Sequence, residues 1–125
     1  MAAACFAIGL CLLGLPSLAG AQAPYRLGPE PAAKPARVVT LAPSLSEIVL
    51  ELGAGDTLAG VSRYDDDPAV AALPRVGGYL DPSPEAILAL RPDLLLVEPS
   101  PGNRAVVERL AGLGVSVLVL PLKGI

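Results

Sequence analysis

The sequence contains no histidine and no tryptophan, and its two cysteines, Cys5 and Cys11, lie near the amino terminus. Without an imidazole base or a later thiol, a histidine-dependent catalytic triad, a thiolate nucleophile and the usual zinc ligand sets are excluded. The chain also lacks a glycine-rich phosphate loop after a strand. We therefore expect no enzymatic activity, no cofactor and no metal centre.

Clustered positive charge is missing too. The nine basic and twelve acidic residues give a net charge of −3, and the basic residues are scattered singly. A nucleic-acid-binding surface needs grouped Lys and Arg, so nucleic acid is not an expected partner. The acidic run Asp65-Asp-Asp67 suggests a cation site, but the EF-hand spacing is absent. Asp67 precedes Pro68 and is expected to cap a short helix, which would leave Asp65 and Asp66 in solvent.

The amino terminus predicts an export signal. Residues 1–24 carry no charged side chain, and the apolar run 6–15 is followed by the small residues Ala19-Gly-Ala21. This pattern predicts a signal peptide over residues 1–21 and a secreted protein, although no Lys or Arg precedes the run. The alternative is a membrane-spanning helix, but Pro16 and a run shorter than ~20 residues favour cleavage. We expect no stable membrane insertion after cleavage.

The remainder of the chain divides into a leader and a domain. Residues 22–36 are rich in proline, which predicts an extended leader. Short apolar strands are expected at residues 37–41, 57–61, 93–97 and 115–120, with helices at 44–52, 83–90 and 103–111 between them. This alternation predicts an α/β fold, a three-layer sandwich around a mainly parallel four-stranded sheet.

Two helices have recognisable starts. Ser44 and Glu47 fit a capping box at the first helix. The expected buried side of that helix consists of Leu45, Ile48, Val49 and Leu52. The second helix has Ser83 as its expected N-cap, followed by Pro84.

The few aromatic residues indicate where a ligand could bind. Beyond the signal segment they are Tyr25, in the leader, and Tyr64 and Tyr79, in loops. Ligands of parallel α/β sheets bind beyond the carboxyl ends of the strands, and Glu98 directly follows a predicted strand. We therefore predict Tyr64, Tyr79 and Glu98 as ligand-binding residues. The alternatives are that the tyrosines only cover loops and that Glu98 is a solvated acid.

Several segments in order resemble the amino-terminal lobe of periplasmic substrate-binding proteins that serve vitamin B12 and iron-siderophore ABC importers. They are Arg37–Glu47, Gly60–Pro68, Val76–Tyr79, Pro84–Leu95 and Leu113–Val115. The resemblance implies two α/β lobes joined by a long helix, with the ligand between them. Residues 37–125 would form the amino-terminal lobe of such a protein, truncated where the linking helix should begin.

The resemblance also implies roles for single residues. Tyr64 and Tyr79 match aromatic positions that contact cobalamin in the B12-binding members, whereas Glu98 stands where those members often have another aromatic. Glu85 matches a glutamate that docks on an arginine of the membrane permease. A first-turn acid that favours the helix dipole explains Glu85 equally well.

The function implied is capture of a large metal-chelate ligand and its delivery to an ABC permease. Cobalamin is the first expectation, and a ferric siderophore or haem comes next. A rival hypothesis is a secreted single-lobe module that binds a protein partner and has no transport role. A hydrolase is the third hypothesis, and the absence of histidine opposes it.

Overall fold

The computed structural model describes residues 23–122. The predicted signal peptide, residues 1–21, lies outside this range. The described strands are β1 (Tyr25–Leu27), β2 (Val38–Thr40), β3 (Leu58–Gly60), β4 (Leu94–Val97) and β5 (Val117–Val119). The helices are α1 (Pro43–Glu51), α2 (Pro84–Ala89) and α3 (Arg104–Gly112), with short 3₁₀ helices at Gly55–Thr57 and Pro68–Val70.

The strands form one sheet in the order β1-β5-β4-β2-β3. The pairs β2·β3, β2·β4 and β4·β5 are parallel, and β1 runs antiparallel to β5. Each parallel crossover contains a helix, which is the connection that parallel strands require. The predicted α/β class and the mainly parallel sheet are therefore confirmed.

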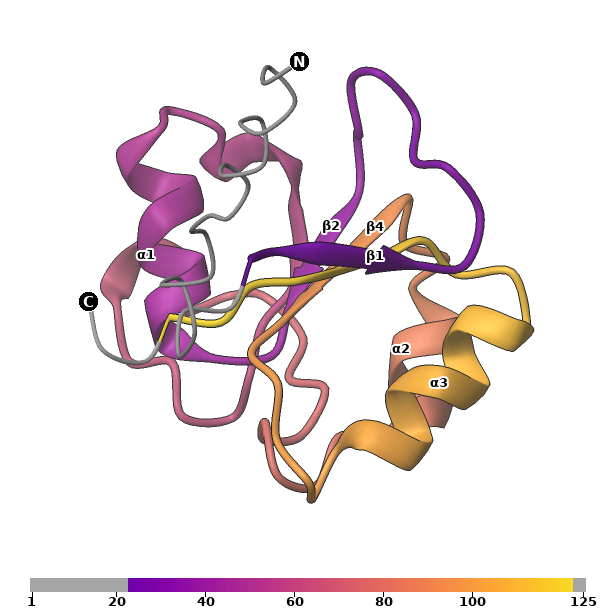
Figure 1. The fold of residues 1–125 in the computed structure, drawn as a ribbon. Coiled ribbons are helices and arrows are strands. Elements are labelled where there is room, and N and C mark those ends of the chain that lie inside the picture. The colour runs from indigo at the N-terminus through magenta and orange to yellow at the C-terminus, as the bar shows by residue number, and fades with distance from the viewer. Residues whose placement is uncertain (1–22, 123–125) are drawn as a thin grey trace, which may run out of the picture.

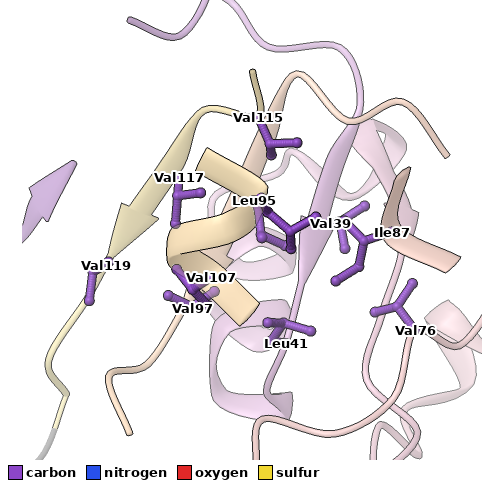
Figure 2. Packing of buried hydrophobic residues seen from close by; sticks show 11 residues of the cluster. Val39, Leu41, Val76, Ile87, Leu95, Val97, Val107, Val115, Val117 and Val119 are labelled. Carbon is purple, nitrogen blue, oxygen red and sulfur yellow. The ribbon is translucent and has the colours of Figure 1, made fainter. Parts of the chain in front are cut away.

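Helices cover both faces of the sheet. In Figure 1, α1 lies on one side of the strands, and α2 and α3 lie on the other. Two aliphatic clusters fill the two interfaces. The cluster on the α2 and α3 side joins helix residues to residues in and next to the strands. The helices contribute Ile87, Val107 and Leu110, and the sheet contributes Val39, Leu41, Leu95, Val97, Val117 and Val119. Figure 2 shows this cluster around Leu95. On the α1 side, Leu45 and Val49 pack with Val38, Leu58 and Leu96.

The prediction of four strands was wrong by one, because the leader contributes β1. Tyr25, Arg26 and Leu27 pair with Val119, Leu118 and Val117. Gly28 then turns the chain with φ +79°, and a Cβ there would lie 2.3 Å from the carbonyl oxygen of Val115. A three-residue edge strand among prolines carries too little periodicity to be recognised in sequence. It covers the edge of β5 that would otherwise be unpaired.

The start of α1 also differs from the prediction. Its N-cap is Ala42, with Pro43 in the first turn, and no side chain caps the helix. The capping box of Ser44 and Glu47 is therefore not formed, because Pro43, which suits a first helical turn, starts the helix earlier. Ile48 and Leu52, which were expected to be buried, are 38% and 76% exposed. With Glu47 and Glu51 they border a shallow depression on the outer side of α1.

Among residues 23–122, no helix is long and apolar enough to cross a bilayer.

Candidate binding face

Three loops gather at the carboxyl edge of the parallel strands. Tyr64 lies in the loop after β3, Glu98 directly follows β4, and Tyr79 lies in the loop that precedes α2. Tyr64 is 57% exposed and Tyr79 is 38% exposed, while Glu98 is partly buried. The loops before α2 and α3 meet at the lower end of the molecule in Figure 1. We call these three loops, residues 61–67, 77–83 and 98–103, the loop face.

The Tyr64 and Tyr79 loops are in direct contact. A Cβ at Gly78 would lie 2.7 Å from Cε2 of Tyr64, so the Tyr64 ring rests on the backbone of the residue before Tyr79. The Arg63 amide also donates a hydrogen bond of 2.9 Å to the Gly77 carbonyl oxygen. The structure therefore brings together two of the residues that the sequence singled out, and both are exposed residues outside the core.

An ion pair joins the same two loops at the surface. The Arg63 guanidinium donates to the Asp81 carboxylate, and its carbon lies 5.2 Å from the centroid of the Tyr64 ring. The bond to Asp81 raises the pKa of Arg63, and the same bond lowers the pKa of Asp81. Both groups are exposed, so the pair contributes little to stability. The Asp81 carboxylate thus neutralises the Arg63 cation that lies over the Tyr64 ring.

Asn103 connects the Tyr79 loop to the Glu98 loop. Its side-chain Nδ2 donates to the carbonyl oxygen of Tyr79 at 2.6 Å and to that of Glu98 at 3.0 Å. Asn103 is only 2% exposed. The same two loops also touch at Gly102, where a Cβ would lie 3.2 Å from the carbonyl oxygen of Leu80. The three loops thus form one continuous surface.

A buried polar network holds the Tyr64 loop from beneath. Asp65 Oδ2 accepts hydrogen bonds from Ser46 Oγ at 3.2 Å and from Ser62 at 3.2 Å (N) and 3.1 Å (Oγ). Ser62 Oγ in turn accepts from the Tyr64 amide. Because the Ser46 hydrogen is directed to Asp65, Thr40 must be the donor in its 2.6 Å bond with Ser46. The network links β2, α1 and the loop.

The expectation that Asp65 lies in solvent was therefore wrong. Asp65 is 6% exposed, because three donors on neighbouring elements satisfy its carboxylate oxygen away from water. The other parts of the prediction are confirmed: Asp66 is exposed, and Asp67 Oδ1 accepts from the Ala69 amide as an N-cap. Within the described residues, no group of three or more Asp, Glu, His or Cys could hold a metal ion.

Glu85 lies apart from these contacts, in the first turn of α2. The predicted cap of this helix is present, because Ser83 Oγ accepts from the Ala86 amide at 3.3 Å. The Glu85 side chain is exposed. Both interpretations of Glu85, a docking residue and an acid favoured by the helix dipole, agree with this position.

Comparison with known proteins identifies the family. A family model described as "Periplasmic binding protein" matches residues 38–121, which is most of the folded part of the chain. The chain belongs to the periplasmic binding protein family. The resemblance inferred from the sequence motifs is thereby confirmed.

Individual relatives agree with this assignment. The vitamin B12-binding protein of Yersinia pestis (strain Pestoides F) is 38% identical over 88 residues, which cover 70% of this chain and 31% of the relative. A periplasmic heme binding protein from Pseudomonas aeruginosa superposes with a TM-score of 0.64 at 37% identity, covering 70% of this chain and 32% of that one. A periplasmic vitamin B12 binding protein of Vibrio cholerae gives a TM-score of 0.62 at 35% identity, covering 68% and 34%. This periplasmic binding protein chain thus spans about a third of the length of these relatives.

Sequence reasoning missed two residues that shape the loop face of this periplasmic binding protein. Asn103 was interpreted only as the start of a helix, and Asp65 as a solvated acid. For Ser46 the sequence did contain a weak signal of burial, because this residue lies one turn before Val49 on the buried side of α1. No sequence pattern indicated that Asp65 or Asn103 would point inward.

Proposed function

We propose that this chain is the amino-terminal lobe of an extracytoplasmic substrate-binding protein that captures a corrinoid and delivers it to an ABC permease. One observation carries the proposal: two exposed tyrosines lie on touching loops at the carboxyl edge of the sheet, with the Tyr64 ring resting on Gly78. Exposed rings on a rigid scaffold provide a large apolar contact with a polar tip. The named relatives that bind vitamin B12 support the same ligand class.

The charges of the loop face favour a neutral ligand periphery. Of three arginines near the loop face, Arg63 pairs with Asp81, Arg104 pairs with Glu108, and Arg75 donates to the carbonyl oxygen of Ser62. Glu98 adds a negative charge. A corrinoid presents amide groups, which can donate to Glu98, whereas haem and most ferric siderophores present carboxylates or other anions that unpaired arginines would attract. We therefore place cobalamin ahead of haem and ferric siderophores as the ligand.

The proposal includes export and docking. Residues 1–21 would direct the chain to the periplasm, and residues 37–125 would form one side of the ligand cleft. Binding involves no chemical conversion. Glu85, exposed at the start of α2, would meet a basic residue of the permease. The matched relatives are about three times as long as the aligned region, which supports a second lobe in proteins of this type.

The Tyr64→Ala variant tests the ligand assignment. We expect the affinity of the purified full-length protein for cyanocobalamin to fall at least tenfold, because the ring supplies a large apolar contact. Isothermal titration calorimetry measures this affinity. Tyr25→Ala is the matched control, since Tyr25 is also exposed but lies in β1 at the edge of the sheet. Unchanged affinity in Tyr64→Ala would remove this residue from the site. Tight binding of haemin with no binding of cyanocobalamin would contradict the corrinoid.

The Glu85→Ala variant tests the docking role. We expect cobalamin uptake by cells to decrease while cyanocobalamin affinity of the purified protein stays the same, because Glu85 lies outside the loop face. Glu51→Ala on α1 is the control, since it removes an exposed acid from the other side of the sheet. Normal uptake with Glu85→Ala would leave only the helix-dipole interpretation.

A further inference from the structure

Asn103 occupies a helix start but does not act as a helix cap. It is the N-cap residue of α3, and its side chain makes no hydrogen bond to the backbone amides of that helix. Asparagine is among the preferred N-cap residues because its side-chain oxygen can satisfy those amides. Here the side chain points to the adjoining loops, so its position serves contacts outside α3.

Both amide hydrogens of Asn103 are used on the loop face. Nδ2 donates to the carbonyl oxygens of Tyr79 and Glu98, which lie 24 and 5 residues away in the chain. These two carbonyls belong to two of the three candidate ligand residues. With 2% exposure, Asn103 is shielded from water that could compete for the same bonds. One buried amide group therefore fixes the backbone of two separate loops.

We propose that Asn103 is a positioning residue that orders the Tyr79 and Glu98 loops before the ligand arrives. This inference rests on the proposed function, since it assigns Asn103 to ligand capture. A loop that is already ordered loses less conformational freedom on binding, so affinity is higher for the same contacts. Asn103 does not touch the ligand; it acts through the residues whose backbones it holds.

The Asn103→Ser variant tests the inference. Serine is as good an N-cap residue as asparagine, so the start of α3 is preserved, but its hydroxyl is shorter and has one hydrogen to donate. We expect the affinity of the purified protein for cyanocobalamin to fall about tenfold. Ser116→Ala is the matched control: it removes the bond from Ser116 Oγ to the Pro29 carbonyl oxygen, just before β5 and outside the loop face, and leaves the bonds of Asn103 intact. We expect its affinity to stay within about twofold of the unchanged protein.

A second measurement needs no ligand. The chain has three tyrosines, so their ring signals can be followed by NMR with ¹³C-labelled tyrosine. In Asn103→Ser we expect the Tyr79 ring signals to shift toward random-coil values or broaden, while the Tyr25 signals stay in place. A merely structural role of Asn103 in α3 would leave the Tyr79 signals unchanged.

The outcomes separate the two claims. Unchanged Tyr79 signals in Asn103→Ser would overturn the inference, and so would unchanged cyanocobalamin affinity. A loss of affinity equal to that of Ser116→Ala would also overturn it, because general destabilisation would then explain the effect. If the unchanged protein fails to bind cyanocobalamin, the proposed function fails, and the Tyr79 signals still decide whether Asn103 orders these loops.

Discussion

Replacement of Asp65 by alanine is expected to lower the free energy of unfolding by about 3 kcal/mol. Asp65 Oδ2 is the common acceptor for Ser46 Oγ and for the amide and hydroxyl of Ser62. All three residues are at most 6% exposed, so the donors left behind could not reach bulk water without local opening. Urea denaturation followed by circular dichroism measures the loss.

Two further variants make the Asp65 experiment specific. Asp65→Asn retains an oxygen at the same place and should lose less stability than alanine. Asp66→Ala removes the neighbouring exposed acid and should change the free energy of unfolding by no more than about 0.5 kcal/mol. Equal denaturation midpoints for Asp65→Ala and Asp66→Ala would show that the buried network does not stabilise the domain.

Replacement of Gly77 by alanine is the second large expected effect, again about 3 kcal/mol of unfolding free energy. Gly77 has φ +94°, and a Cβ there would lie 2.7 Å from the Asp81 carbonyl oxygen and 3.0 Å from the Ser83 amide nitrogen. Both atoms belong to the backbone, so neither can rotate away. The turn would have to open, which would move Tyr79. Thermal and urea denaturation measure the loss.

Two other glycines separate the causes of this loss. Gly114 also has a positive φ, of +102°, but nothing lies within 4 Å of its Cβ position, so Gly114→Ala should cost only about 1 kcal/mol. Gly112, in α3, has open space at its Cβ position, and alanine there should stabilise the protein by about 0.5 kcal/mol. If Gly77→Ala lowered the free energy of unfolding no more than Gly114→Ala does, the close contacts with Asp81 and Ser83 would not be the cause of the loss.

Local patterns predicted the elements that depend on local interactions. Ser83 followed by Pro84 predicted the start of α2, and Ser83 does accept from Ala86. Asp67 before Pro68 predicted an N-cap, and that bond is present. The apolar run Leu94–Val97 predicted a central strand, and β4 lies between β2 and β5. Such signals succeed because the interacting groups are within a few residues of one another.

Predictions failed where a distant partner decides the outcome. Tyr25–Leu27 became a strand because the edge of β5, some ninety residues later, offers hydrogen bonds. Ile48 and Leu52 stay exposed because no described element covers that side of α1, although their spacing suits burial. Asp65 is buried because Ser46 and Ser62 converge on it. Propensity alone cannot anticipate contacts of this kind.

By itself the sequence determined the α/β class, the family, and the position of Tyr64, Tyr79 and Glu98 in loops at one edge of the sheet. It could do so because strand and helix periodicities and loop motifs are encoded locally. Only the tertiary structure decided how those loops are held together. Three contacts hold them, and each joins residues that are separated in the chain. The Tyr64 ring rests on Gly78, Asn103 donates to two carbonyl oxygens, and Asp65 accepts from Ser46. Such contacts exist only once the sheet has brought its strand ends to a common edge.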